Sequence, residues 1–168
     1  MTGKSFAPRH KLTVAQVESL FAPPPAMAAL GARAVHADSF APGHEPDKAI
    51  DGDPVTIWHT PWTPDAPTYP HEIQIELGRE VTVKGFTYLP RQDMQNGWIS
   101  RYRVFVGSNR SNWGAPAAEG EFPHGNDAKT IVFDRPVRGR FFRFVAVEGI
   151  GGQKFASVAD LDILADQH

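Results

Sequence analysis

Apolar and polar residues alternate with a period of two over most of the chain from about residue 34 onward. In the stretch 71–77, isoleucine or leucine occupies every second position from Ile73 to Leu77 and polar residues occupy the positions between. This alternation predicts a β-strand with one face in a hydrophobic core. Comparable short apolar runs occupy residues 81–89, 101–106, 129–133, 140–147 and 158–164.

The segments between these runs favour antiparallel pairing of the strands. Glycine, proline, asparagine and aspartate bound the runs, and no helical pattern separates them. Consecutive short strands without crossover helices pair antiparallel. The chain contains 15 glycines and 15 prolines among 168 residues, a content that favours many short strands over long helices. We therefore expect an all-β domain over residues 34–168, an antiparallel β-sandwich of the jelly-roll type.

The first 33 residues follow a different pattern. Residues 13–21 predict a short helix, because Thr13 and Gln16 have the spacing of a capping box and the apolar residues that follow share one helical face. The prolines at positions 23–25 end this helix. We interpret residues 1–33 as an N-terminal appendage with a stiff proline-rich linker. The alternative is that the helix packs on the side of the domain.

Composition narrows the classes of function. With 17 lysines and arginines, 19 aspartates and glutamates and a net charge of −2, the chain has neither a polybasic nucleic-acid arm nor an acidic disordered tail, and we expect no nucleic-acid partner. Cysteine is absent, which excludes disulfides, thiolate metal sites and thiol nucleophiles. No run approaches the roughly 20 apolar residues of a membrane span, and no signal-peptide pattern opens this chain.

A first cluster of unusual residues lies in the segment 47–62. Asp51, Asp53 and Thr56 offer oxygen atoms within one tight loop, which Gly52 and Pro54 would bend. Hard cations such as Ca²⁺ take six to eight oxygen ligands, many of them from backbone carbonyls. The loop is therefore a candidate calcium site, although an Asp-Gly-Asp segment taken alone can also be a simple turn.

Two further loops collect planar hydrogen-bonding groups and an aromatic ring. The loop 89–98 contains Arg91 and Asn96, for which a surface ion pair with Asp93 and an Asn-Gly turn are the plainer alternative. The glycine-rich loop 149–157 contains the isolated aromatic Phe155. It is not a phosphate cradle, because it lacks the Lys-Ser/Thr pair of a P-loop and no helix follows it.

The histidines near Trp62 do not indicate catalysis. Neither His59 nor His71 has a histidine partner at helical or hairpin spacing, and no nucleophile elbow is present. We therefore expect no catalytic residue. Aromatic rings beside planar donors suit a sugar instead, since its C–H face packs on an aromatic ring while its hydroxyl groups take hydrogen bonds. The residues that supply this mixture are His59, Trp62, Arg91, Asn96 and Phe155.

Four segments taken together resemble a known family. Residues 47–62, 89–98, 111–114 and 156–161 are similar to F5/8 type C, or discoidin, domains, and within them to family 32 carbohydrate-binding modules. The resemblance covers residues 34 to 164 and leaves residues 1–33 uncovered. It implies an eight-stranded jelly roll that binds sugars at one end, with a structural Ca²⁺ nearby.

The resemblance also implies which residues bind the ion and the sugar. The Ca²⁺ ligands would be the carbonyls of Lys48 and Ala159 and the side chains of Asp51, Asp53, Thr56 and Asp160, where Asp160 replaces the usual glutamate. The sugar ligands would be His59, Trp62, Arg91, Asn96 and Phe155. Relatives that bind galactose have a glutamate soon after the first strand; Phe40 stands near that place here, and Glu45 could substitute from the same loop.

These features predict a non-catalytic carbohydrate-binding module for terminal galactose-type sugars. We expect it to be joined to a catalytic domain within a larger glycan-active enzyme that is secreted, at the cell surface or periplasmic. A protein-interaction scaffold on the same fold is one alternative. Phospholipid binding is another, less favoured because the chain lacks the disulfide of such relatives and its loop 61–70 is not basic.

Overall fold

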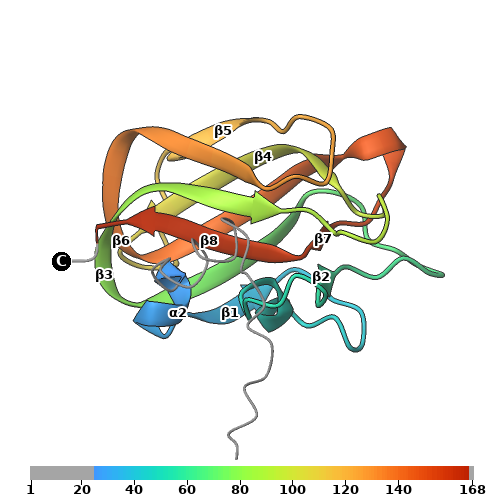
Figure 1. Ribbon diagram of the computed structural model, residues 1–168, viewed down its shortest axis with the longest axis horizontal. Helices are drawn as coiled ribbons and strands as arrows, with labels where there is room; N and C mark the ends of the chain where they lie inside the picture. Colours follow the sequence, from blue (N-terminus) through green and yellow to red (C-terminus); the bar gives the residue numbers. More distant parts are fainter. Residues whose placement is uncertain (1–24, 167–168) are drawn as a thin grey trace, which may run out of the picture.

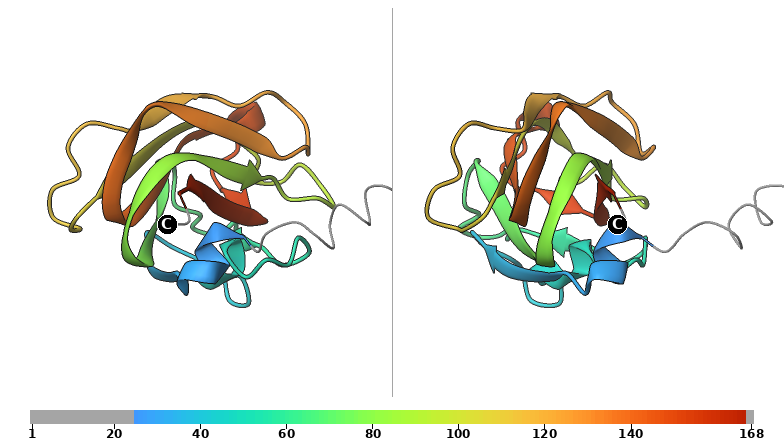
Figure 2. Two further views of the ribbon diagram at one scale, coloured as in Figure 1. Left: turned by 60° about the vertical axis from the view of Figure 1, so that its left-hand side comes forward. Right: turned by 90° about the vertical axis from the view of Figure 1, so that its left-hand side faces the viewer.

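Residues 25–166, which the computed structural model describes, form a β-sandwich with very little helix (Figures 1 and 2). The elements are α2 (Ala26–Leu30), β1 (Arg33–Ala37), η1 (Pro46–Ala49), β2 (Trp58–His59), β3 (His71–Leu89), β4 (Ile99–Gly107), β5 (Ala118–Glu121), β6 (Lys129–Gly149), η2 (Ile150–Gly152), β7 (Ser157–Val158) and β8 (Asp160–Ala165). All strand pairs are antiparallel. The predicted all-β class and antiparallel pairing are confirmed.

The two long strands β3 and β6 belong to both layers of the sandwich. Residues 71–76 of β3 and 141–149 of β6 pair with each other and with β1 and β4, and β5 pairs with β4. Beyond a register shift at residues 76–81, residues 81–89 of β3 lie between β6 and β8 in the second layer. The predicted runs 71–77 and 81–89 are thus one continuous strand that bends, and the runs 129–133 and 140–147 are another.

The core between the layers consists of the alternating apolar residues that the pattern indicated. Ile73, Ile75 and Leu77 are completely buried, as are Phe142 and Phe144 on the neighbouring strand. Burying a side chain of this size contributes about 1.5–3 kcal/mol. The core therefore fixes which faces of β3 and β6 point inward, and with them the positions of the loops that follow.

The N-terminal part of the described chain packs directly on this core. Met27 of α2 is 2% exposed, and the Asp162 carboxylate of β8 accepts hydrogen bonds from the backbone N–H groups of Ala26 (3.1 Å) and Met27 (2.9 Å). These N–H groups have no partner within the helix, so the carboxylate caps it. Packed structure therefore precedes residue 34, where we expected the domain to begin. The predicted helix 13–21 and Pro23 and Pro24 lie outside the described residues.

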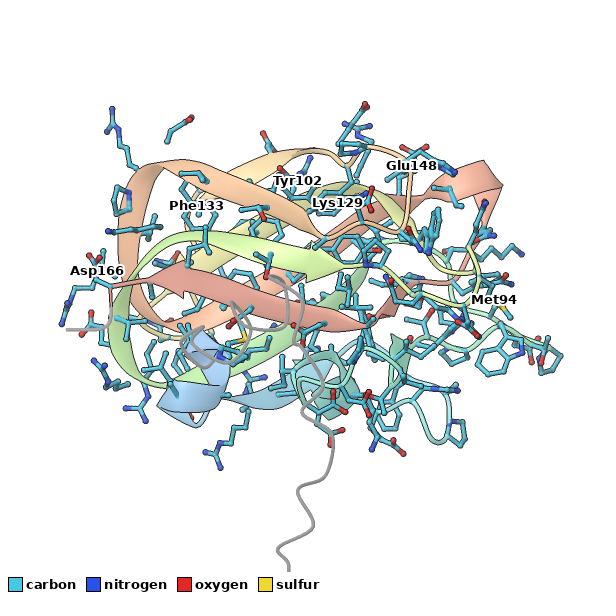
Figure 3. All side chains as sticks on the ribbon, viewed as in Figure 1. Met94, Tyr102, Lys129, Phe133, Glu148 and Asp166 are labelled. Atoms are coloured by element: carbon cyan, nitrogen blue, oxygen red, sulfur yellow. The ribbon has the colours of Figure 1, made fainter. Side chains whose placement is uncertain are left out.

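The ends of the sandwich carry different features. Figure 3 places Asp166, just after β8, at one end of the long axis and Met94, in the loop between β3 and β4, at the other. Helix α2 lies beside β8, toward the Asp166 end (Figure 1). None of the helices in the described part of the chain is long and apolar enough to cross a membrane.

Candidate ligand-binding site

A pocket of about 310 Å³ lies at the Met94 end, among loops that are far apart in the sequence. Its lining residues are His44, His59, Trp62, Arg91, Met94, Asn96 and Phe155. Five of the six residues that we expected to bind sugar therefore meet around one cavity. They come from β2 and the segment after it, from the β3–β4 loop, and from the segment before β7.

A short two-stranded ribbon fixes His59 and Phe155 relative to each other. Strand β2 pairs with β7, with His59 opposite Ser157. Beyond the ribbon, the Thr60 N–H donates to the Ala156 carbonyl (2.9 Å), and the Ala156 N–H donates back to the Thr60 hydroxyl (2.9 Å). Because these groups are fully buried, the bonds hold the two segments at a fixed separation.

Aromatic rings form one wall of the pocket. The His59 ring lies edge-to-face against Trp62, with centroids 4.8 Å apart, and 5.4 Å from Phe155. His44 lies 6.0 Å from both His59 and Trp62. Trp62 itself is 47% exposed, so about half of the residue remains open to a ligand.

His59 is held as a hydrogen-bond acceptor toward the pocket. The ring is 3% exposed, and Nδ1 lies 2.6 Å from the Thr60 carbonyl oxygen, to which it can only donate. Burial lowers the pKa of His59, and the nearby positive charge of Arg91 lowers it further. The neutral ring with hydrogen on Nδ1 leaves the lone pair of Nε2 to accept a hydrogen bond from a ligand hydroxyl.

Arg91 is positioned through both its side chain and its backbone. The guanidinium makes a two-point contact with Asp93, at 2.7 Å from Nε and 3.3 Å from Nη2. The sequence analysis gave this ion pair with Asp93 as the alternative to a sugar-binding role for Arg91. In the structure Arg91 makes the ion pair and also lines the pocket. The Trp98 indole N–H donates to the Arg91 carbonyl (2.8 Å). The pairing thus orients the guanidinium at the pocket wall.

The Asn96–Gly97 turn is fastened to β7. The Ser157 hydroxyl donates to the Asn96 carbonyl (2.8 Å), and the Ser157 N–H donates to the Gly97 carbonyl (2.9 Å). The Gly97 N–H donates to the side-chain oxygen of Gln153 (2.9 Å). Gly97 has φ 87°, a conformation that glycine adopts without strain. The turn thereby presents the Asn96 side chain at the pocket.

The segment before Phe155 is held by Tyr69, two positions before β3, and by His71, the first residue of β3. The Tyr69 hydroxyl donates to the Phe155 carbonyl (2.9 Å). His71 is completely buried, with Nε2 2.6 Å from the Lys154 carbonyl and Nδ1 2.8 Å from the Asp38 carboxylate. His71 therefore lies outside the pocket and positions the segment that contains Phe155.

The structure separates Glu45 from the pocket and adds two residues that the sequence analysis missed. Hydrogen bonds from the backbone N–H groups of Glu45 itself and of Gly43 (3.1 Å) lower the pKa of the Glu45 carboxylate. Glu45 is not among the lining residues. Its neighbour His44 lines the pocket instead, and so does Met94. The aromatic character of His44, so close to Glu45 in the same loop, was the available signal; Met94 offered none.

The loop 51–56 adopts a tight conformation stabilised by its own carboxylates. Asp51 accepts from the Asp53 N–H (3.0 Å), and Asp53 accepts from the Val55 N–H (2.9 Å). The Thr56 hydroxyl contacts both the Asp51 carboxylate and the Asp53 carbonyl. The three predicted oxygen donors of this loop therefore lie next to one another.

Asp160 brings a further carboxylate to this loop from β8. Burial raises the pKa of Asp160 to about 7, and the negative charges of Asp162 and Asp51 add to the effect. A cation bound beside Asp160 would relieve this repulsion, and carboxylate, hydroxyl and carbonyl oxygens are the ligands that a hard cation takes. Within residues 25–166 no three histidine, aspartate or glutamate side chains are arranged to hold a metal ion, so the carbonyls of Lys48 and Ala159 would have to complete the site.

Comparison with known sequences identifies relatives among glycan-active enzymes. The family model for the F5/8 type C domain matches residues 34–161. A galactose oxidase from Gibberella zeae is 40% identical over 133 residues, which are 77% of this chain and 19% of the relative. A sialidase from Micromonospora viridifaciens is 39% identical over 116 residues, 68% of this chain and 18% of the relative. The chain therefore spans about a fifth of the length of these relatives.

Solved structures of carbohydrate-binding modules share the fold. The CBM32-5 module from Clostridium perfringens, in complex with GalNAc-β-1,3-galactose, is 36% identical with a TM-score of 0.73 and covers 81% of this chain and 97% of its own. The family 32 module of NanJ from the same organism, in complex with galactose, is 29% identical with a TM-score of 0.71, at 83% and 96% coverage. The chain belongs to the F5/8 type C domain family, and its structural neighbours there are family 32 carbohydrate-binding modules.

Proposed function

We propose that the protein is a non-catalytic carbohydrate-binding module that recognises terminal galactose-type sugars. The observation that carries this proposal is the convergence of His59, Trp62, Arg91, Asn96 and Phe155 around one pocket. The pocket combines an exposed aromatic face with groups that donate or accept hydrogen bonds in fixed directions. That combination is what a single sugar ring requires.

The preference for a galactose-type ring follows from the geometry of its hydroxyl groups. An axial O4 can donate to Nε2 of His59 and accept from Arg91 while the opposite, apolar face of the ring packs on Trp62. An equatorial O4, as in glucose, points elsewhere and leaves the buried polar groups of the pocket without a partner. Each such loss costs about 1–3 kcal/mol. The relatives solved with galactose or GalNAc-β-1,3-galactose support this choice.

The affinity of a single site is expected to be modest. The pocket is small and open, so we expect dissociation constants on the order of micromolar to millimolar. Useful attachment to a glycan then needs additional modules or a linked enzyme, which raise the effective concentration. We propose that the module is joined to a glycan-active catalytic domain in a secreted, cell-surface or periplasmic protein. The support is that galactose oxidase and sialidase relatives are about five times longer than their matched parts.

A structural Ca²⁺ is the second part of the proposal. Asp51, Asp53, Thr56 and Asp160 would hold it with their side chains, and Lys48 and Ala159 with their carbonyls. The ion would link the loop after η1 to β8 and neutralise the carboxylates that repel one another there. Its role would be to stabilise the fold. It would also help to position the pocket residue His59, because His59 and the ligand Thr56 are three positions apart in one segment.

The test of sugar binding is a titration of galactose, N-acetylgalactosamine and glucose, followed by tryptophan fluorescence. We expect the first two to change the emission and glucose to change it only at much higher concentration. If none of the three sugars changed the tryptophan emission, the proposal would be refuted. A change on addition of anionic phospholipid vesicles instead would indicate the membrane-binding alternative.

Substitutions test whether the response comes from the pocket. Calorimetry is the readout, because the variants that replace a tryptophan also remove a fluorophore. Arg91→Ala should weaken galactose binding about tenfold or more, the value expected for hydrogen bonds from a charged group. Trp62→Ala should weaken it through lost stacking, with little effect on the melting temperature. The matched controls are Arg138→Ala, which removes an exposed arginine 3.5 Å from Glu80, and Trp113→Phe, which changes a tryptophan outside the pocket. If Trp62→Ala lowered stability and left binding unchanged, Trp62 would be a packing residue only.

A further inference from the structure

A second pocket of about 180 Å³ lies on the other side of the β3–β4 loop. Pro90 and Trp98, at the two ends of that loop, line it, whereas Arg91, Met94 and Asn96 line the candidate sugar pocket. The two pockets share this loop but no lining residue. Figure 3 places Lys129, which lines the second pocket, nearer the middle of the molecule than Met94, which lines the first.

A largely buried lysine lines the second pocket. Lys129, the first residue of β6, is 8% exposed, and its Nζ donates to the Gly125 carbonyl (3.1 Å). No carboxylate of the described chain lies within ion-pair distance of Nζ. Asp127 is the nearby acid: its Oδ2 and Lys129 Nζ would lie 3.9 Å and 3.7 Å from a Cβ at Gly125, and its side chain is exposed to solvent. An ammonium group has three donors, and the Gly125 carbonyl takes one of them, so the other two are available to an anion.

Aromatic side chains form the walls of the same pocket. Trp98 and His124 pack edge-to-face with centroids 5.2 Å apart, and Phe122 and Tyr88 pack 4.7 Å apart. The Tyr88 hydroxyl accepts a hydrogen bond from the Ile99 N–H (3.2 Å), which leaves its own hydrogen available to donate. Burial raises the pKa of Tyr88, so the hydroxyl stays protonated. The pocket thus offers a second donor beside the ammonium.

We propose that this pocket binds the carboxylate of an acidic monosaccharide, with the carboxylate at Lys129 Nζ and the Tyr88 hydroxyl and the ring against the wall that Trp98 and His124 form. The pocket is smaller than the 300–1,000 Å³ that drug-sized ligands occupy, which limits the occupant to one ring. This site does not depend on the galactose site, because it uses other residues. Both occupants would contact the loop 90–98, so a protein that uses both would recognise glycans with neutral and acidic sugars.

The test is a two-dimensional NMR titration of the full isotope-labelled chain with glucuronate, glucose and acetate. Glucose is the neutral ring of the same shape, and acetate is the anion without a ring. We expect glucuronate to shift the indole N–H of Trp98 while that of Trp62 stays in place, and we expect glucose and acetate to shift neither at the same concentrations. High salt should weaken the effect, because the attraction is electrostatic.

Variants then test the role of the ammonium. Lys129→Met keeps the length of the side chain and removes its charge, and should weaken the glucuronate response at Trp98 about tenfold or more. Lys129→Arg keeps the charge and should retain a response, which covers the case in which the methionine variant fails to fold. The matched control is Lys84→Met, since Lys84 is half-exposed on β3 and pairs with Asp166. No response at Trp98, an equal response to acetate, a shift at Trp62 alone, or an unchanged response in Lys129→Met would each overturn the proposal.

Discussion

Replacing Gly97 by alanine tests whether the pocket depends on the close contact between the Asn96–Gly97 turn and β7. A Cβ at position 97 would lie 2.4 Å from the Ser157 hydroxyl oxygen and 2.6 Å from the Ser157 backbone nitrogen. Ser157 is completely buried in the β2–β7 ribbon, so it cannot move aside. The turn must therefore shift away from β7, and Asn96 must shift with it.

The expected loss of free energy of unfolding has two contributions, and the same substitution at a second glycine, Gly114, distinguishes them. Alanine in the left-handed region costs about 1–2 kcal/mol whatever its surroundings, and this part applies to Gly97 with φ 87° and to Gly114 with φ 66°. Overpacking adds about 1–3 kcal/mol, and this part applies only at Gly97, because a Cβ at Gly114 has nothing within 4 Å. We expect Gly97→Ala to lower the free energy of unfolding by about 2–5 kcal/mol and Gly114→Ala by about 1–2 kcal/mol.

Urea unfolding followed by tryptophan fluorescence measures both values, and calorimetry with galactose measures the effect on the pocket. Gly97→Ala should bind galactose more weakly than the wild type at a temperature where it remains folded, whereas Gly114→Ala should bind it equally well. If the two variants lost the same free energy of unfolding, the contact with Ser157 would not restrain the turn. Unchanged galactose binding in Gly97→Ala would show that the pocket does not need this position of Asn96.

Two other predictions concern the ion and His59. Chelation of divalent ions should lower the melting temperature of the wild type, because the ion binds the folded state and not the unfolded one. Asp53→Ala should abolish this effect of chelation. Asp65→Ala, which replaces an exposed aspartate outside the loop, should leave it unchanged. A melting temperature indifferent to chelation would contradict the calcium site. Burial lowers the pKa of His59, so below pH about 6.5 the unfolded state binds a proton that the folded state still excludes. Stability should therefore fall as the pH drops from about 6.5 through the lowered pKa, and His59→Gln should reduce this fall; an identical pH dependence in the variant would contradict the assignment.

The strands that could be predicted are those whose pattern is set by the core. Residues 71–77 alternate because one face is buried, and that signal survives in the sequence without knowledge of the partner strand. The short edge strands β1 and β5 carry no such signal, since their residues are half-buried or exposed. The sequence also did not predict that neighbouring runs join into the long strands β3 and β6. Polar, exposed residues such as Arg79 separate the runs, as residues of a turn would.

The site was predictable where chemistry and family resemblance coincide, as for His59, Trp62 and Arg91. His44 was missed because its place in the pocket depends on how the loop before η1 folds back on His59, through the bond from the His59 N–H to the His44 carbonyl (3.3 Å). That contact is between segments 15 positions apart and leaves no local pattern. Met27 was missed for the same reason, since its burial depends on Asp162 at the far end of the chain.

The places where the described chain enters and leaves the sandwich determine where a connection to a neighbouring domain would begin. The described chain enters at α2, which Asp162 ties to β8, and it leaves after β8 at Asp166. Both points lie toward one end of the long axis, and the candidate sugar pocket lies at the other (Figures 1 and 3). A connection to a neighbouring domain would therefore start on the side of the molecule away from the pocket. If the module is joined to a glycan-active domain as proposed, the full length of the sandwich would lie between the bound sugar and the points where the connections begin.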